Sequence, residues 1–193
     1  IQSIGIDDYE ADDVIATLAH ESRGPTRIVT GDRDLFQLVD DDRDIKIIYL
    51  AKGISKHDLV DHKWIAERYE IPGERYALFA MIRGDASDGL PGIKGIGEKG
   101  AAAIAREFRS MSEVIAAAES SDERLNKKHR EKILADLEYA RVTEPLVKCA
   151  TDIRLPKVDF TLSRERTLDS KLKEIKERYG LGTSIDMLLA SLS

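Results

Sequence analysis

Cysteine is almost missing from this chain of 193 residues. The single thiol, Cys149, excludes an internal disulfide and any zinc site built on pairs of cysteines. Disulfides accumulate in oxidising compartments, whereas a chain with one cysteine fits a reducing one. We therefore expect a cytoplasmic protein.

Long apolar runs are missing as well. No stretch approaches the roughly 18 apolar residues of a membrane span, so we expect no membrane partner. The first residues lack the charged, apolar and small-residue regions of a secretory signal peptide. The chain starts with Ile1 rather than methionine and enters an acidic motif almost at once, at Glu10. We therefore expect it to be the later part of a longer protein.

An excess of positive charge is also lacking, since the formal net charge is −6. Taken alone, this argues against a nucleic-acid binder, because such proteins usually carry a basic excess. The argument weakens if the acids are concentrated in one site. Apolar residues make up 42% of the chain, enough for a hydrophobic core in one medium domain or in a core with a small subdomain.

Glycine, in contrast, is concentrated in one place. Six of the 13 glycines lie between Gly84 and Gly100, where they alternate with apolar residues. Small residues there let backbone N–H groups approach a phosphate, and a helix starting at Glu98 adds its positive N-terminal end. The alternative is that the glycines only allow tight helix packing. The run lacks the Gly-Lys-Ser/Thr ending of a nucleotide-binding loop.

Periodicity predicts an α/β part followed by a helical part, divided softly near Gly53 into residues 1–53 and 54–193. Two β-branched strands separated by a crossover favour a parallel sheet. The expected strands are Thr26–Thr30 and Ile45–Leu50, with a helical turn at Leu35–Leu38 between them. The expected helices are Glu10–Ser22, Asp61–Tyr69, Gly73–Arg83, Glu98–Phe108, Ser112–Ala118, Arg124–Thr143, Leu168–Tyr179 and Ser184–Leu192, with an irregular stretch at Cys149–Arg166. Aromatic residues on these helices, Trp64, Tyr69, Tyr76 and Phe79, fall at core-like spacings.

Three acidic clusters stand out from the ordinary charged surface. The first opens the first helix, where acids also serve as caps that favour the helix dipole. The second follows a strand at the sheet edge where ligands collect, although a polar turn has the same composition. The third precedes the glycine run, and alone is turn chemistry. The clusters are Glu10, Asp12 and Asp13, then Asp32 and Asp34, then Asp85 and Asp88.

If these seven carboxylates converge, they cannot all be ionised without a compensating charge. All-oxygen ligands, with no nearby histidine or cysteine pattern, favour Mg²⁺ or Mn²⁺ over zinc. Two such ions about 4 Å apart would activate a water and stabilise the leaving oxygen of a phosphodiester. The sequence thus indicates a two-metal phosphodiesterase, provided that the clusters meet in space.

In this order, the three clusters and the glycine run resemble one family, the bacterial 5′ nucleases or flap endonucleases. The segments that carry the resemblance are YEADDVIATLA (Tyr9–Ala19), TGDRDLFQLV (Thr30–Val39) and RGDASDGLPGIKGIGEKGAAAI (Arg83–Ile104). The resemblance implies a PIN-like nuclease core followed by a helical region. That region contains a helix–three-turn–helix at about residues 84–108, which grips duplex DNA by the phosphates of one strand.

The resemblance also implies roles for individual residues. Glu10 and Asp12 match ligands of a first divalent metal, and Asp13 lies near it or binds through water. Asp32, Asp34 and Asp88 match catalytic ligands of a second metal, and Asp85 completes that set. The expected DNA contacts are Gly92, Lys94, Gly95, Gly97 and Lys99. A potassium ion is implied on the backbone carbonyls of Gly92, Lys94 and Gly97.

The family carries an upstream part that this chain lacks, with the first sheet strand, two further aspartates and a helical arch that threads a 5′ flap. The expected partner of the intact protein is duplex DNA with a 5′ flap or 5′ end, and a monomeric, free-standing enzyme is expected. Two other functions stay open, a non-catalytic duplex-binding module with structural metal and a PIN-type ribonuclease. Arg33 either contacts a phosphate or balances local charge. The basic run at 127–132 either extends the DNA contact or forms a solvated helix face.

Overall fold

The computed structural model describes residues 3–86, 88–157 and 167–192. The chain forms two compact units. The first unit is Gly5–Leu155, and the second consists of Ile1–Ile4 and Pro156–Ser193. The acids and the glycine run all belong to the first unit. The predicted boundary near Gly53, between the α/β part and the helical part, falls inside this unit.

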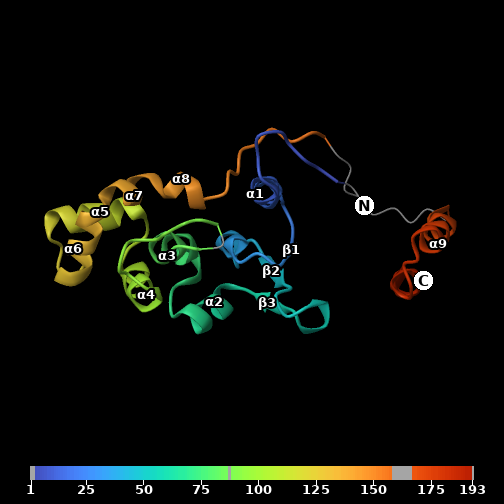
Figure 1. Ribbon diagram of the computed structural model, residues 1–193, viewed down its shortest axis with the longest axis horizontal. Helices are drawn as coiled ribbons and strands as arrows, with labels where there is room; N and C mark the ends of the chain where they lie inside the picture. Colours follow the sequence, from blue (N-terminus) through green and yellow to red (C-terminus); the bar gives the residue numbers. More distant parts are fainter. Residues whose placement is uncertain (1–2, 87, 158–166, 193) are drawn as a thin grey trace. The chain divides into compact units, whose positions relative to one another are not determined.

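The first unit begins with the α/β part. Its elements are α1 (Ala11–Glu21), β1 (Thr26–Thr30), the 3-10 turn η1 (Asp34–Leu38), β2 (Ile45–Tyr49), the short turn η2 (Ile54–Lys56) and β3 (Asp58–Val60). The strands lie in the order β1-β2-β3. β1 pairs with β2 in parallel, with Thr26 opposite Ile45, and β2 pairs with β3 in antiparallel (Figure 1). The expected parallel pair is confirmed, while β3, three residues long, was not predicted.

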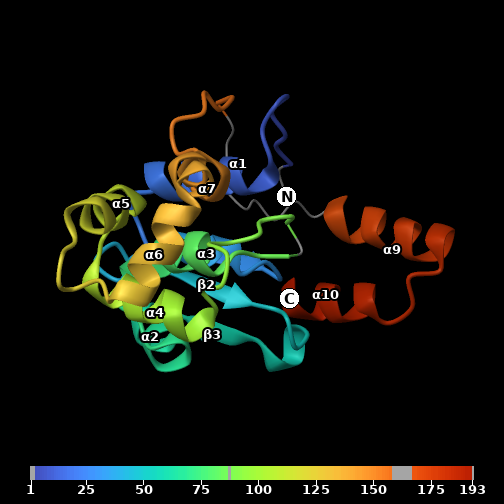
Figure 2. The same ribbon diagram turned by 60° about the vertical axis from the view of Figure 1, so that its left-hand side comes forward.

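The helical part continues from the same core. Its elements are α2 (His62–Tyr69), the turn η3 (Gly73–Arg75), α3 (Tyr76–Arg83), α4 (Glu98–Glu107), α5 (Met111–Ser120), α6 (Lys127–Ala135), α7 (Leu137–Val142) and α8 (Glu144–Val147). α3 is the central helix, since it packs against η1, α4 and α8 (Figure 2). The second unit contains α9 (Thr167–Tyr179) and α10 (Ser184–Leu192). None of the helices in the described residues is long and apolar enough to cross a membrane.

An aromatic cluster joins η1 to the helical part. The ring of Phe36 lies 4.9 Å from Tyr49 and 5.3 Å from Tyr76, both in edge-on contacts that aromatic pairs prefer. The cluster continues through Trp64, Tyr69 and Phe79, so the prediction that these aromatics serve packing is confirmed. Because η1 starts at Asp34, this cluster fixes one end of an acidic cluster against α3.

One helix prediction is wrong. Residues 124–143 do not form one helix but break at Asp136, whose backbone leaves the helical region at φ −127° and ψ 31°. The Asp136 carboxylate accepts the backbone N–H of Lys94 at 2.9 Å, across 42 residues of sequence. A tertiary hydrogen bond to the glycine run therefore accompanies the break, and local periodicity carries no sign of it. Of the predicted irregular stretch Cys149–Arg166, residues 158–166 lie outside the described part, and the remainder is irregular.

Two glycines of the run form a close backbone contact. A side chain on Gly92 would place its Cβ 2.4 Å from the carbonyl oxygen of Arg83, and Gly92 has a left-handed φ of 67°. Gly84 faces the same contact from the other side, with the Gly92 nitrogen 2.4 Å from its ideal Cβ position. The end of α3 and the glycine run thus touch backbone to backbone, which only glycine permits. For these two residues the packing alternative is correct.

The backbone contact at Gly92 predicts that adding one methyl group there destabilises the fold. Gly92→Ala should lower the free energy of unfolding by about 2 kcal/mol or more, because the clash is with backbone and φ is positive. Gly31→Ala is the matched control, since nothing lies within 4 Å of its ideal Cβ position. Urea unfolding of the two variants measures the difference, and equal stabilities would contradict the packing role.

Candidate metal centre and phosphate-binding hairpin

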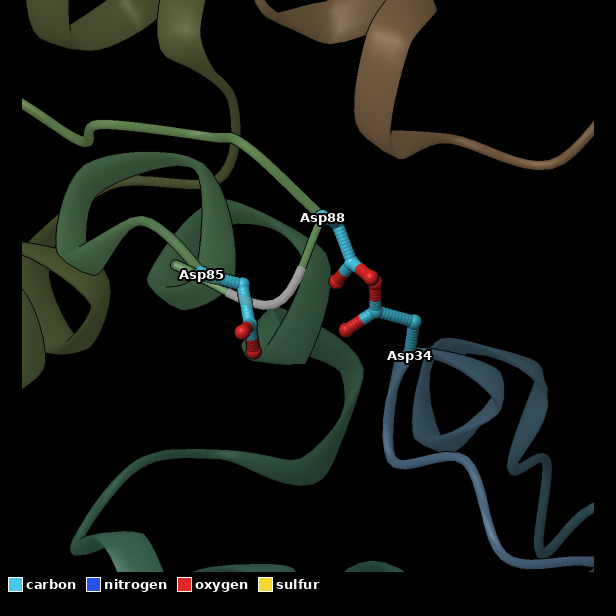
Figure 3. Close-up of side chains that lie close together, drawn as sticks. All are labelled: Asp34, Asp85 and Asp88. Carbon is cyan, nitrogen blue, oxygen red and sulfur yellow. The ribbon is translucent and has the colours of Figure 1, made fainter.

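Three aspartates from distant parts of the sequence meet in one cluster. One carboxylate oxygen from each of Asp34, Asp85 and Asp88 lies within 4.8 Å of the others (Figure 3). Asp34 comes from the start of η1, whereas Asp85 and Asp88 come from the loop after α3. The second and third acidic clusters therefore converge, as the metal hypothesis requires. Asp85 is buried, Asp34 is half-buried and Asp88 is exposed.

Local hydrogen bonds hold the second cluster at the end of β1. The carboxylate of Asp32 accepts the Asp34 N–H at 2.9 Å, and the Asp32 N–H donates to the Thr30 hydroxyl at 2.9 Å. These are the side-chain turns that aspartate and threonine favour. The polar-turn alternative therefore describes the local structure correctly. The same turn places Asp34 against Asp88, so the two interpretations are compatible.

The pKa values of two acids in this arrangement are raised. Burial, followed by the charges of Asp88 and Asp32, raises the pKa of Asp34 from its ordinary 3.8 to about 7. Burial also raises the pKa of Asp12, and the next contributions come from Asp32, Glu10 and Asp13. Asp12 thus lies close enough to the second cluster to be affected by its charge. A cation placed among these carboxylates would relieve the repulsion.

Asp13 has a different role from its neighbours. Its carboxylate accepts the backbone N–H of Glu10 at 3.2 Å and that of Ala150 at 2.8 Å. The first bond belongs to a capping box at the start of α1, in which the Glu10 side chain accepts in return. The capping alternative is therefore correct for Asp13. Its role near a metal stays a prediction.

The bond to Ala150 belongs to a strap, Val147–Ile153, that the sequence did not reveal. Thr17 of α1 donates its hydroxyl to the Ala150 carbonyl at 3.3 Å, and Gln37 of η1 donates its amide to the Val147 carbonyl at 2.9 Å. The Gln37 amide oxygen accepts the N–H of Cys149 at 3.2 Å. The strap ties α1, with Asp12, to η1, with Asp34. No spacing or residue type marks this contact, because its partners on the strap are backbone atoms.

Two arginine side chains donate hydrogen bonds to Asp85. Its Oδ2 accepts hydrogen bonds from Nε of Arg33 at 2.9 Å and from a second nitrogen of the same guanidinium. Arg83 donates to the same oxygen at 3.3 Å, and its guanidinium carbon lies 5.0 Å from the centre of the Phe79 ring. The Asp85 side chain is only 4% exposed. A buried carboxylate needs such partners, because desolvation of an unpaired charge is costly.

The glycine run forms the expected hairpin between α3 and α4. Ile93 and Ile96 are buried, while the N–H of Ile93 donates to the Ile82 carbonyl at 2.9 Å. The polar side of the hairpin faces outward. Of the predicted DNA contacts, Gly92 is buried, whereas Lys94, Gly95, Gly97 and Lys99 are exposed. Gly97 is the N-cap of α4, with nothing within 4 Å of its ideal Cβ position, so the helix start is open to a ligand.

Helix α6 supports the hairpin turn from one side. Lys132 donates its ammonium to the Gly95 carbonyl, while Asp136 accepts the Lys94 N–H. The basic run at 127–132 thus contributes a structural contact through Lys132. Lys127 pairs with Glu131 on the exposed face of α6, as in a solvated helix. Potassium on the hairpin carbonyls stays a prediction.

The raised pKa of Asp34 predicts how stability varies with pH. The folded protein holds this proton more tightly than the unfolded chain, so the free energy of unfolding without metal should fall between about pH 4 and about pH 7. Asp34→Asn stays neutral and should reduce this fall, leaving the metal-free protein more stable than wild type at about pH 8. Urea unfolding in the presence of a chelator, at about pH 5 and about pH 8, measures this fall in the free energy of unfolding. Asp42→Asn, on an exposed loop, is the control, and an unchanged fall in Asp34→Asn would contradict the assignment.

Comparison with known proteins gives two matching family descriptions. Residues 1–70 match the N-terminal resolvase-like domain of 5′-3′ exonucleases, and residues 71–178 match their C-terminal SAM fold. A 5′-3′ exonuclease of Streptomyces coelicolor is 40% identical over 193 residues, all of this chain and 64% of the relative. One of Mycobacterium tuberculosis is 38% identical over all of this chain and 63% of the relative. The chain thus spans less than two thirds of the length of these relatives.

Solved structures agree on the fold. A zinc-bound T5 5′-exonuclease superposes with a TM-score of 0.59 at 22% identity, covering 75% of this chain and 51% of that one. A T5 flap endonuclease described as a pseudo-enzyme-product complex with DNA and metal ions gives a TM-score of 0.58 at 21% identity, with the same coverage. With the carboxylate cluster and the hairpin in place and both family descriptions matched, the chain belongs to the 5′-3′ exonuclease family.

Proposed function

We propose that the intact protein is a metal-dependent 5′ nuclease that hydrolyses DNA phosphodiesters at a 5′ flap or 5′ end. The observation that carries the proposal is the meeting of Asp34, Asp85 and Asp88 at the root of an exposed glycine hairpin. Acids that repel one another are thus held beside a surface suited to phosphate. Asp85 and Asp88 belong to the same continuous segment as the hairpin, Arg83–Ile104, whereas Asp34 comes from η1.

The carboxylates fit divalent cations. Their donor set is all oxygen, which suits Mg²⁺ and Mn²⁺. Burial and neighbouring acids raise the pKa values of Asp34 and Asp12, and a bound cation would favour the ionised form of both groups. Asp34, Asp88 and Asp32 would hold one ion, and Glu10 and Asp12 would contribute to another. Bound divalent ions supply an activated water and stabilise the leaving oxygen.

The protein's own groups would do the positioning. The hairpin would hold one strand of duplex DNA through Lys94, Gly95, Gly97 and Lys99, by contacts that do not read sequence. The N-terminal end of α4 favours a phosphate there. The strap Val147–Ile153 would keep Asp12 and Asp34 at a constant separation. A phosphodiester next to the hairpin would then lie over the acids.

The solved structures of similar proteins support the proposed function but do not determine it for this chain. The T5 structures described above contain divalent metals in one case and DNA with metals in another, and these descriptions concern those proteins. Flap preference, the identity of the physiological metal, potassium on the hairpin, a monomeric state and a cytoplasmic location all stay predictions for the intact protein.

A non-catalytic duplex-binding module remains the second candidate. It is favoured by Asp85, which the arginines already neutralise as a structural carboxylate would be. This candidate predicts salt-sensitive duplex binding and no hydrolysis with any metal. A PIN-type ribonuclease has less support, because the glycine hairpin is well formed and exposed.

The test compares three forms of the intact protein on a labelled 5′-flap duplex with Mn²⁺. Asp88→Asn should reduce the cleavage rate by about 10²-fold or more, since it removes a proposed ligand. Its affinity for the duplex should be kept or strengthened, because a negative charge near the phosphates is lost. Asp42→Asn is the charge-matched control and should cleave as wild type does.

Chelation should abolish cleavage by wild type. Normal cleavage by Asp88→Asn would remove this residue from the metal site. Duplex binding by wild type without cleavage under Mg²⁺ or Mn²⁺ would favour the binding module instead.

A further inference from the structure

One side of the aromatic cluster borders a cavity of about 580 Å³. Ligand pockets typically have volumes of about 300 to 1,000 Å³, so this cavity has the size of a small-ligand site. It lies between the end of β2, the loop that leads to β3, and α2. Three aromatic and three cationic side chains contribute to its wall. They are Tyr49, Trp64 and Tyr69, with Arg33, Lys52 and Arg68.

Packing explains only the inner side of the three rings on this wall. Between ring centres, the buried Phe36 lies 4.9 Å from Tyr49 and 5.5 Å from Trp64. The buried Tyr76 lies 5.3 Å from Tyr69 in the same way. The three outer rings are themselves half-buried, so each keeps some exposed surface. Because buried rings already hold them in place, they would lose little conformational entropy on binding a ligand.

Arg68 is the cation on this wall that the described residues leave without a charged partner. Both acids on the wall already have lysine partners, since Asp58 lies 3.0 Å from Lys52 and Glu67 lies 3.8 Å from Lys63. Arg68 makes no hydrogen bond or ion pair with any residue that the structure describes. Its guanidinium carbon lies 6.0 Å from the ring centre of the tyrosine that follows it. Aromatic rings beside a cation suit an unpaired nucleotide, because rings take the base and cations take the phosphate.

The aromatic cavity adjoins the metal centre at one side chain. Arg33 lines this cavity and also a second one of about 530 Å³. The wall of the second cavity includes Asp85 of the carboxylate cluster, together with Gly89 and Pro91, which begin the glycine hairpin. A DNA strand bound at the metal centre therefore has the aromatic cavity next to it.

We propose that the aromatic cavity binds one unpaired nucleotide of a DNA strand that is held at the metal centre. The base contacts Trp64 and Tyr69, and Arg68 contacts a phosphate. This inference rests on the proposed function and adds to it a site for unpaired DNA. A free mononucleotide offers the same base and phosphate, but the connection through Arg33 favours a nucleotide within a strand.

Fluorescence tests the contact with the base, because Trp64 is the only tryptophan of this chain. The intact protein carries Asp88→Asn to prevent turnover, and subtracting the emission of a Trp64→Phe variant isolates the signal of this residue. A duplex with a 5′ flap of thymidines should quench Trp64 emission, since a base then contacts the indole ring. A fully paired duplex should bind without this quenching. Equal quenching by both duplexes, or none by a bound flap duplex, would overturn the proposal.

Thymidine 5′-monophosphate distinguishes the two sources of a nucleotide. At the concentration at which the flap duplex saturates the protein, the free mononucleotide should leave Trp64 emission unchanged. Quenching as strong as that by the flap duplex would show that the cavity takes free nucleotides, and the assignment to a DNA strand would be wrong.

The phosphate contact is tested by Arg68→Gln, in the same Asp88→Asn background. Arg68 is exposed on α2, so the change removes a charge without opening the core. It should weaken binding of the flap duplex by about 5-fold and reduce its salt slope by about 0.7, as loss of one single-strand phosphate contact does. Binding of the fully paired duplex should stay unchanged. Equal weakening for both duplexes would contradict a site for unpaired DNA.

Lys63→Gln is the matched control for this measurement. Lys63 is exposed on the same helix and carries the same charge, but it lies outside the cavity wall. Its removal should change neither affinity nor salt slope for either duplex. If Arg68→Gln behaves as Lys63→Gln does, the phosphate contact is wrong.

Failure of this inference differs from failure of the proposed function. If Trp64→Phe fails to fold, the comparison of Arg68→Gln with Lys63→Gln decides the proposal. A wild-type protein that cleaves the flap while Arg68→Gln keeps its affinity and salt slope overturns this inference alone. A wild-type protein that binds Mn²⁺ but neither binds nor cleaves either duplex overturns the proposed function as well.

Discussion

Repulsion between carboxylates is the constraint on which the arrangement of this protein depends. Burial, with the charges of Asp88 and Asp32, raises the pKa of Asp34 to about 7, and burial with the charge of Asp32 also raises the pKa of Asp12. Groups that repel one another separate unless the surrounding structure holds them. Each acid therefore has its own restraint, an aspartate turn for Asp34, a strap for α1 and two arginines for Asp85. Where such restraints surround a raised pKa, a functional site is the common reason.

Sequence reasoning performed best where a residue's role is local. The strand Thr26–Thr30 and the helix Ser184–Leu192 have the predicted bounds, and the buried isoleucines of the hairpin follow from their alternation with glycine. The second acidic cluster follows β1 at the predicted sheet edge, and Asp34 of that cluster meets the third cluster, which lies in the loop after α3. The acid clusters and the glycine run, taken together, were specific enough to indicate the family.

The failures involve tertiary partners, several of them distant in sequence. The break at Asp136 accompanies a hydrogen bond from Lys94, and Asp13 is held by Ala150. Asp85 resembles its neighbour Asp88 in sequence, yet arginines 52 and 2 residues away give it a different environment. Gly92 and Gly97 resemble each other in the same way, although one is packed against backbone and the other is open. Composition and spacing carry no signal for such differences.

The strap has a consequence for the order in which the protein takes shape. Its bonds to Asp13 and Thr17 join residues 137 and 133 positions apart. During synthesis, α1 leaves the ribosome long before Ala150 exists, so its acids face the second cluster without their final restraint. Contacts of such sequence separation form slowly, because loop closure must precede them. The nascent chain thus passes through a stage in which the nuclease core has its strands but not its assembled carboxylate site. The bonds of the strap to α1 can form only after Ile153 has left the ribosome.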